Sequence, residues 1–278
     1  MRRAKLFGVS EQFECGLVTG SSAGLGEEFA IQLAGRLSRM VLVARREDRL
    51  QDLATRLREN FEIEVLVVAA DIADPSECEK VYQKVTEHGW NVDILVNNAG
   101  LGDYGEFRSS EWGRNEAMLR VNVEALTYLA HLFLPSMIAR EGGTIVNVSS
   151  LANTLPIPDF AVYAATKAYV SSFSEALRME VREFGVNVLA VCPGPVKTEF
   201  GSIAAREEGG PGMPGGRDAF YVPRQQVVSE AIAALEDGSA CVYPGWKVAL
   251  AAAGISLLPM IAIRLIMSSR PRRQKLLE

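Results

Sequence analysis

The sequence lacks the features of a nucleic-acid-binding, metal-binding or secreted protein. The 278 residues carry a net charge of −5 with a pI near 5.4, so there is no general basic surface for nucleic acid. The N-terminal stretch MRRAKLFGVSEQFE starts basic but has no apolar h-region, which a secretory signal needs. The four cysteines have no metal-ligand spacing, so no metal site is expected, and they indicate small core residues in a reducing compartment. These cysteines are Cys15, Cys78, Cys192 and Cys241. We therefore expect a cytoplasmic protein.

Apolar segments with strand and helix patterns alternate along the chain, without an internal repeat or a linker. A chain of this length that is 48% hydrophobic and 23% charged fits one domain with a substantial core. The alternation predicts a parallel sheet covered by helices on both faces, in a doubly wound α/β fold. Seven strands are predicted near 15–19, 40–44, 64–69, 93–97, 143–149, 187–192 and 240–243. Helices are predicted near 24–37, 46–60, 75–88, 111–140, 158–184 and 223–236.

The segment CGLVTGSSAGLGEEFAIQLA predicts a short apolar strand, a glycine-rich turn and a helix. Gly20, Gly24 and Gly26 are spaced G-x3-G-x-G. Such a turn aims backbone N–H groups and the positive end of the helix dipole at one point, where a pyrophosphate can bind. Ser21 and Ser22 add hydroxyl donors. The alternative is a tight connection without a ligand, and the strand and helix on either side favour the binding turn.

A tyrosine, a lysine and a serine lie within one short stretch of the chain. Tyr163 and Lys167 are four residues apart in YAATK, and Ser150 precedes the tyrosine by thirteen residues. On a helix, residues i and i+4 share a face, so the ammonium can favour ionisation of a phenol that ordinarily titrates at about 10. The phenol could then exchange a proton with a carbonyl oxygen. The alternative is an ordinary aromatic residue and a surface lysine on an amphipathic helix.

With these motifs in view, the chain resembles the short-chain dehydrogenase/reductase family over nearly its whole length. The matching positions follow the family's order: TGSSAGLG at 19–26, Asp71, NNAG at 97–100, Asn122, Ser150, Tyr163, Lys167 and PGPVKT at 193–198. The resemblance implies a single Rossmann fold, an NAD(P)-dependent oxidoreductase and a small-molecule substrate. It also leads us to expect a homodimer or homotetramer.

The resemblance assigns roles to individual residues. The catalytic tetrad is matched by Asn122, Ser150, Tyr163 and Lys167. The expected cofactor-binding residues are Gly20, Ser21, Ser22, Gly24, Leu25, Gly26, Arg45, Arg46, Asp71, Ile72, Asn98, Ala99, Gly100, Tyr163, Lys167, Pro193, Gly194, Val196 and Thr198.

The end of the second predicted strand, VLVARRED, bears on the choice of dinucleotide. An acidic side chain there would bind the adenosine ribose, whereas this chain has Ala44 followed by Arg45 and Arg46. A guanidinium can make a bidentate contact to a 2′-phosphate. We therefore expect NADP(H) rather than NAD(H), with Arg45 as the first candidate and Arg46 as the second. The alternative is that both arginines begin a solvated helix.

Other residues are expected to line the same groove. Asp71 would reach the adenine amino group beside the backbone of Ile72, because Asp74 is the better N-cap for the following helix. Asn97 and Asn98 can tie neighbouring strands together. The nearby Ala99 and Gly100 let the ribose approach, Pro193 and Gly194 lie beneath the nicotinamide, and Thr198 could bond the carboxamide or a phosphate.

The hypothesis for reduction is that hydride reaches a carbonyl carbon while Tyr163 protonates the oxygen. Ser150 would donate to the same oxygen, and its spacing favours it over Ser149. Lys167 would stabilise the tyrosinate and hold the ribose hydroxyls. Asn122 would position a water that leads to solvent, and an asparagine within a helix also indicates a local irregularity. The alternative function is a non-catalytic dinucleotide sensor or scaffold.

The substrate end is expected to be apolar. Glycines and prolines gather between 201 and 221, which predicts a loop without regular structure. The resemblance implies that this segment, at about 201–222, is a lid over the substrate. The residues that flank the tetrad are mostly apolar, so a ketone, aldehyde or secondary alcohol of some hydrophobicity is expected. The flanking candidates are Leu151, Asn153, Leu155, Phe160 and Pro195.

Residues 245–278 extend the Rossmann-fold region 1–244 and are expected to belong to the same domain. The stretch 248–267 is nearly all apolar, but Pro259 and Arg264 interrupt it, so a transmembrane span is not favoured. We expect two short helices packed against the substrate pocket or a neighbouring subunit. The less favoured alternative is a membrane-surface anchor, with the basic residues after 269 near anionic headgroups.

Overall fold

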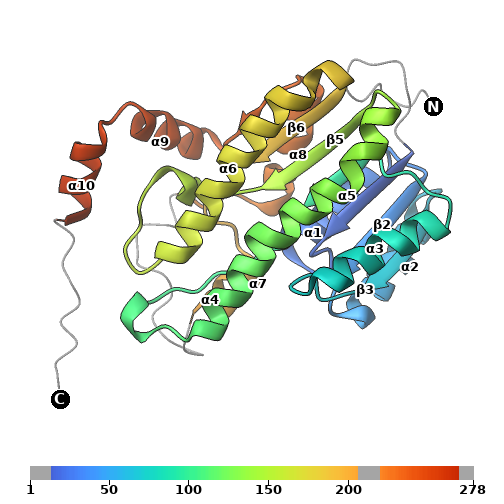
Figure 1. Cartoon of the computed structure of the whole chain (residues 1–278), viewed down its shortest axis with the longest axis horizontal. Helices are drawn as coiled ribbons and strands as arrows, with labels where there is room; N and C mark the ends of the chain where they lie inside the picture. Colours follow the sequence, from blue (N-terminus) through green and yellow to red (C-terminus); the bar gives the residue numbers. More distant parts are fainter. Residues whose placement is uncertain (1–13, 206–219, 269–278) are drawn as a thin grey trace.

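A seven-stranded parallel sheet forms the centre of the protein in the computed structural model, which describes residues 14–205 and 220–268 (Figure 1). The strand order is β3-β2-β1-β4-β5-β6-β7. The strands are β1 (Cys15–Thr19), β2 (Arg39–Ala44), β3 (Glu64–Ala69), β4 (Ile94–Asn97), β5 (Gly143–Val148), β6 (Val186–Val191) and β7 (Cys241–Val242). All seven predicted strands are present, and their bounds differ from the predicted ones by no more than two residues, which confirms the doubly wound α/β fold.

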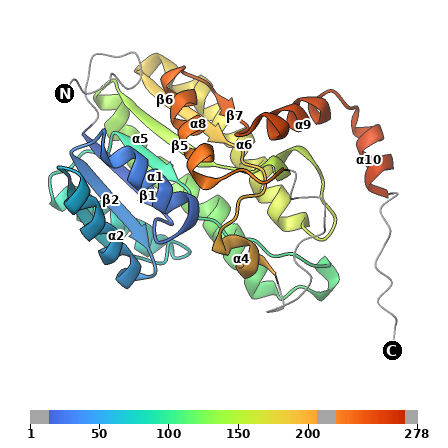
Figure 2. The ribbon, with the colours of Figure 1, turned by 180° about the vertical axis from the view of Figure 1, so that it is seen from behind.

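Helices cover both faces of the sheet. One layer holds α1 (Gly24–Ala34), α2 (Glu47–Asn60) and α8 (Arg224–Glu236), which are in front in Figure 2. The other holds α3 (Pro75–Glu87), α5 (Leu126–Ala139) and α6 (Ala161–Val181), which are in front in Figure 1. The remaining helices are α4 (Trp112–Leu119), α7 (Glu199–Ala204), α9 (Trp246–Ser256) and α10 (Met260–Ser268).

Residue patterns explain these elements. Side chains alternate across a strand, so Val18 packs into the α1 layer and Leu17 into the α3 layer. Both are fully buried, as expected for a parallel strand covered on both faces. At the start of α3 the side chain of Asp74 accepts a hydrogen bond from the Ser76 amide at 2.9 Å, and Pro75 occupies the first turn. Asp74 is therefore the N-cap that the sequence predicts.

The strand order positions the site. From β1 the chain moves outward to β2 and β3, and then returns to β4 on the other side of β1. The connections that leave β1 and β4 therefore diverge, which opens a crevice at the carboxyl ends of these strands. Thr19 ends β1 and Asn97 ends β4, so the glycine-rich turn and the NNAG segment both lie at this crevice.

Three helical segments differ from the predicted pattern. The helix predicted at 111–140 contains a π-helical turn at Arg120–Ala125, which confirms the irregularity expected at Asn122. Helix α6 begins at Ala161 rather than 158, because Asp159 adopts a positive φ of 63° that an α-helix does not contain. The loop predicted from 201 is helical up to Ala204, so the absence of regular structure predicted there is wrong. The rest of that loop, 206–219, lies outside the described residues. Beyond β7 the two expected short helices are present as α9 and α10.

Candidate active site

The glycine-rich turn between β1 and α1 has little room for a side chain at its three glycine positions. Gly20 and Gly24 have positive φ angles of 67° and 62°. A Cβ on Gly26 would lie 2.4 Å from the Gly20 carbonyl oxygen and 2.5 Å from Nδ2 of Asn98. Ala23, the N-cap residue of α1, makes no side-chain cap hydrogen bond, so its side chain leaves the first amides of the helix available to a ligand. A turn of this shape fits a pyrophosphate.

Asn98 and Thr19 hold the turn against the end of β4. The Asn98 side chain donates to the Thr19 carbonyl at 2.9 Å, and the amides of Asn98 and Ala99 both donate to the Thr19 hydroxyl at 3.0 Å. Next to it, the Asn97 amide donates to the side chain of Asn147 on β5 at 3.0 Å. Both asparagines of NNAG therefore tie neighbouring strands together, as expected from the sequence.

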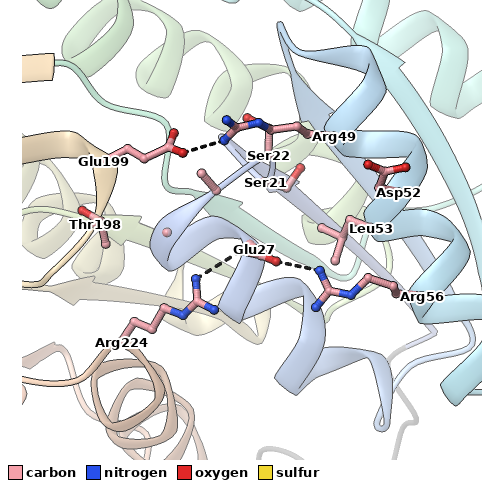
Figure 3. A pocket seen from close by; sticks show the side chains of 12 residues that line it. Ser21, Ser22, Glu27, Arg49, Asp52, Leu53, Arg56, Thr198, Glu199 and Arg224 are labelled. Carbon is pink, nitrogen blue, oxygen red and sulfur yellow. Dashed lines mark hydrogen bonds and ion pairs between the residues drawn. The ribbon is translucent and has the colours of Figure 1, made fainter. Parts of the chain in front are cut away.

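A pocket of about 350 Å³ opens beside the turn, at the adenosine end of the crevice (Figure 3). Charged side chains in opposed pairs surround it. In Figure 3, Glu199 faces Arg49, and Glu27 lies between Arg56 and Arg224. The lining residues are Ser21, Ser22, Ala23, Gly24, Glu27, Arg49, Asp52, Leu53, Arg56, Thr198, Glu199 and Arg224.

The two arginines that follow β2 point to different places. The guanidinium of Arg46 donates to the Ser22 hydroxyl at 3.2 and 3.1 Å, within the glycine-rich turn. It also pairs with Glu199 at 2.8 Å. Arg45 is 65% exposed at the side chain and lies 3.9 Å from Asp71, whose carboxylate also accepts from the Ala73 amide. Of the two candidates, Arg46 is the one whose side chain contacts the phosphate-binding turn.

Glu199 was not singled out from the sequence, yet it pairs with both Arg46 and Arg49 at this end. Hydrogen bonds from Arg46 and Arg49 lower the pKa of its carboxyl to about 2. The carboxylate therefore stays ionised between the two guanidiniums. No sequence signal identifies it, because α7 and α2 are about 150 residues apart and meet only in the folded chain.

Lys167 is buried on α6 next to the end of β5. Its side chain donates to the Val148 carbonyl at 2.8 Å. Burial lowers the pKa of the amine from 10.5 to about 8, because the low-dielectric surroundings disfavour the ammonium. Its Nζ lies 5.8 Å from the centre of the Tyr163 ring, so the two groups of YAATK share one environment as predicted.

Asn122 lies in the π-helical turn and reaches the same place. Its side chain accepts from the Leu101 amide at 2.8 Å and donates to the Leu101 carbonyl at 2.9 Å. It also donates to the hydroxyl of Thr166, which in turn donates to the Tyr163 carbonyl at 2.7 Å. Thr166 is thus a link between Asn122 and Tyr163 that the sequence analysis did not identify.

Gly100 marks the point where these groups meet. A Cβ on Gly100 would lie 3.4 Å from both the side-chain oxygen of Asn122 and Nζ of Lys167. The absence of a side chain therefore leaves space directly beside the asparagine and the lysine. Gly100 directly follows Ala99, whose Cα would lie 2.9 Å from a Cβ on Gly20, so the asparagine and the lysine lie next to the glycine-rich turn.

Aromatic side chains surround Tyr163. The Phe160 ring stacks on the Tyr163 ring, with 4.3 Å between the ring centroids. The ring of Phe200, which belongs to α7, lies 5.6 Å from the Tyr163 ring by the same measure. Tyr104 meets Phe160 edge-on. Met118 and Ala152 complete this apolar cluster. The phenol is buried among apolar groups, which strengthens electrostatic interactions with any charge nearby.

The two serines that follow β5 point in different directions. The Ser149 hydroxyl donates to the Lys167 carbonyl at 2.8 Å and contacts the Ser171 hydroxyl at 2.8 Å, so both of its partners are residues of α6. Ser150 caps the 3-10 turn η3 (Leu151–Thr154), where its hydroxyl accepts from the Ala152 amide at 3.1 Å. Ala152 of η3 belongs to the apolar cluster that contains Tyr163, so the turn that Ser150 caps packs beside the tyrosine.

The PGPVKT segment lines the opposite wall. The Pro193 carbonyl accepts from the Leu151 amide at 2.8 Å, and Thr198 caps α7 by accepting from the Phe200 amide. The Thr198 methyl lies 3.2 Å from the position of a Cβ on Gly24, so this threonine is next to the phosphate-binding turn. Asn153 was expected to line the substrate pocket. Its side-chain amide donates to Ser171, Cys192 and Tyr243.

The side chains of the remaining cofactor candidates pack wholly or partly into the core. Ile72 is buried in the α3 layer, and Leu25 packs against the α1 layer. Val196 is packed against the same α1-side core. Gly194 faces Val248 of α9, whose Cγ2 would lie 2.7 Å from a Cβ at Gly194.

Comparison with known proteins agrees with this arrangement. A family model described as short chain dehydrogenase matches residues 14–208. The chain belongs to the short-chain dehydrogenase family. It is 34% identical over 196 residues to very-long-chain 3-oxoacyl-CoA reductase from Homo sapiens, a match that covers 68% of this chain and 62% of that relative.

Solved structures of this family share the fold over nearly the whole chain. A 7beta-hydroxysteroid dehydrogenase is 27% identical with a TM-score of 0.81, and the match covers 93% of this chain and 98% of that one. A short-chain dehydrogenase from Sphingobium yanoikuyae, solved in complex with NADPH, is 28% identical with a TM-score of 0.76, covering 95% and 98%.

Proposed function

We propose that this short-chain dehydrogenase interconverts a carbonyl and an alcohol on a small hydrophobic substrate, with NADP(H) as the cofactor. The observation that carries the proposal is that Asn122 and Lys167 lie beside Gly100, with the Tyr163 ring 5.8 Å from Nζ of Lys167, next to the glycine-rich turn. A buried phenol beside a buried amine is suited to proton transfer to a carbonyl oxygen.

The residues of the turn fit a dinucleotide. The positive φ angles at Gly20 and Gly24, the missing Cβ at Gly26 and the uncapped start of α1 form a cradle that a side chain would fill. When bound, NADP(H) supplies or accepts the hydride. Thr198 and Ser22, which border the cradle, are placed to donate to its phosphates.

Tyr163 is the group that gives or takes the proton at the substrate oxygen. Lys167 stabilises the tyrosinate through space and, with one donor on the Val148 carbonyl, has further donors to offer to ribose hydroxyls. Ser150 donates to the substrate oxygen as charge develops there. Asn122, through Thr166, holds the first turn of α6 and so fixes the position of Tyr163.

The cofactor preference rests on the charges that follow β2. Arg46, held against Ser22, is the first candidate for the 2′-phosphate, and Arg45 is the second because it points to Asp71. The Sphingobium yanoikuyae relative was solved with NADPH, which supports NADP(H) as the cofactor. Arg46→Ala should weaken NADPH binding by about tenfold or more with little effect on NADH, whereas Arg45→Ala should change both less. A wild type that binds NADH more tightly than NADPH would contradict the preference.

The substrate class follows from the walls around Tyr163. Phe160, Phe200 and Met118 present apolar surface, which suits a ketone or secondary alcohol with hydrophobic substituents. The names of the relatives, a 3-oxoacyl-CoA reductase and a hydroxysteroid dehydrogenase, are consistent with bulky lipophilic carbonyl compounds.

The test is NADPH oxidation, followed by absorbance, with a panel of steroid ketones, 3-oxoacyl thioesters, aryl ketones and short aliphatic aldehydes. The expected result is turnover with the hydrophobic members of the panel. The enzyme should also be saturated at a lower concentration of NADPH than of NADH. Tight NADPH binding without turnover on any member, in either direction, would instead favour a sensor or scaffold and would contradict the proposal.

A further inference from the structure

Helices α9 and α10 present an apolar surface to solvent. Of the sixteen large apolar side chains that are exposed among the described residues, eight lie within the 23 residues from 246 to 268. The exposed fractions reach 84% at Leu257, 68% at Ile261 and 67% at Leu265. We call this surface the α9–α10 apolar face. It comprises Trp246, Leu250, Leu257, Leu258, Met260, Ile261, Leu265 and Ile266.

This face is not covered by the rest of the described chain. Only Val248 and Ala252 of α9 and Ile263 of α10 are buried. In both Figures 1 and 2, α10 stands away from the sheet and its helical layers, at the far end of α9. The two helices were expected to pack against the substrate pocket or a neighbouring subunit. Helix α9 contacts η3, and its Val248 meets Gly194, whereas the apolar side chains named above are left exposed. Exposed apolar surface of this extent marks an interaction site.

The charge of this segment is opposite to that of the remaining chain. Residues 246–277 contain no aspartate or glutamate but six basic residues. The whole chain has 29 basic and 34 acidic residues, so residues 1–245 have 23 and 33, a net charge of −10. The basic residues are Lys247, Arg264, Arg270, Arg272, Arg273 and Lys275. The apolar face is thus combined with a concentration of positive charge.

The geometry excludes a simple membrane span by this segment. The axes of α9 and α10 differ by 111°, with the break at Pro259. Helices of 11 and 9 residues are about 17 and 14 Å long, well short of the roughly 30 Å of a hydrocarbon core. The only longer apolar helix among the described residues, Trp112–Ala139, packs with its α5 part on the sheet. Two short helices at an angle can instead lie in the plane of a membrane surface.

We propose that the α9–α10 apolar face docks on the surface of an anionic phospholipid bilayer. Its apolar side chains would enter the boundary between headgroups and acyl chains, and the basic residues would lie among the lipid phosphates. A symmetric dimer through the same face would bring together two segments that each carry six basic residues in their sequence, whereas anionic lipid neutralises this charge. The charge distribution therefore favours lipid over a second copy.

Docking in this way would bring the substrate end of the crevice close to lipid. Helix α9 packs against η3, which follows Ser150, and against Gly194 of the opposite wall. A lipophilic substrate could then reach Tyr163 from the bilayer without crossing bulk water. The docking surface itself does not depend on the proposed reaction.

The experiment is sedimentation of the full chain with vesicles of phosphatidylcholine alone and of phosphatidylcholine mixed with phosphatidylglycerol. The expected result is binding to the mixed vesicles that weakens with added salt, because each basic residue near the surface contributes about a fivefold increase in binding. The double variant Ile261→Asp, Leu265→Asp should bind the mixed vesicles at least about tenfold more weakly than the wild type. The matched control is Met179→Asp on α6, where the side chain is 62% exposed, and it should bind as the wild type does.

Two results would overturn the proposal. One is recovery of the wild type in the supernatant with both kinds of vesicle. The other is a concentration-dependent dimer without lipid that Ile261→Asp, Leu265→Asp dissociates, since the face would then be an interface between copies of the chain. Circular dichroism and NADPH titration of each variant check folding, because neither Ile261 nor Leu265 belongs to the crevice.

Discussion

Burial of Lys167 should make the stability of the protein depend on pH in a defined way. The pKa of its amine falls from 10.5 to about 8 in the folded chain, which corresponds to about 3 kcal/mol of disfavoured charge. Because the folded pKa is the lower one, the unfolded chain binds more protons at this residue between pH 8 and pH 10.5. Raising the pH through that window therefore stabilises the folded wild type, and the penalty is present in full below pH 8.

The perturbation is Lys167→Met, which keeps a long side chain without the amine. At neutral pH the variant no longer carries the burial penalty of the ammonium, which raises its free energy of unfolding by about 3 kcal/mol. The Val148 carbonyl loses its hydrogen-bond partner, which lowers the free energy of unfolding by about 1–3 kcal/mol. The discriminating quantity is thus the pH dependence. Between pH 8 and pH 10 the wild type should gain about 2 kcal/mol relative to the variant.

Urea unfolding followed by circular dichroism at several pH values, without cofactor, measures this difference. Lys80→Met is the control, because Lys80 is 45% exposed and pairs with Glu77 on the surface of α3, so its curve should parallel the wild type. Parallel curves for the wild type and Lys167→Met would refute the burial argument. The Met variant should also lose turnover, since no ammonium remains beside Tyr163.

Two further predictions concern the phosphate-binding end. Glu199→Gln removes the carboxylate that occupies Arg46 and Arg49, so the dissociation constant for NADPH should fall by about two- to fivefold while that for NADH stays unchanged; equal changes for both would contradict a role near the 2′-phosphate. Gly26→Ala places a methyl 2.5 Å from Nδ2 of Asn98, so thermal unfolding should show a loss of about 1–3 kcal/mol and NADPH titration a loss of binding. A Gly26→Ala protein as stable as the wild type would mean that the turn can move.

The sheet and most helices could be predicted because their signals are local. Seven apolar strands and the amphipathic pattern of helices such as α2, with Leu50, Leu53 and Leu57 buried, are visible in the sequence itself. The motifs TGSSAGLG, NNAG and YAATK identify the crevice, because parallel strands bring their carboxyl ends to one edge. The N-cap at Asp74 was also predictable from its side chain and the following proline.

Features that depend on long-range contact were not predictable. Helix α7 is short, and the contact of its Glu199 with Arg46 and Arg49 joins residues about 150 positions apart. The choice between Arg45 and Arg46 depends on which side chain turns toward Ser22, which strand periodicity does not determine. The packing of α9 and α10 could not be predicted either, because an apolar pattern indicates burial without identifying the covering surface.

The central claim is that Tyr163 transfers the proton at the substrate oxygen beside a bound dinucleotide. The most direct test is Tyr163→Phe, measured for NADPH oxidation with the best carbonyl substrate and for NADPH binding by fluorescence titration. The account predicts that turnover falls by about a hundredfold or more while the dissociation constant for NADPH hardly changes. A Phe variant that turns over at the wild-type rate would contradict it.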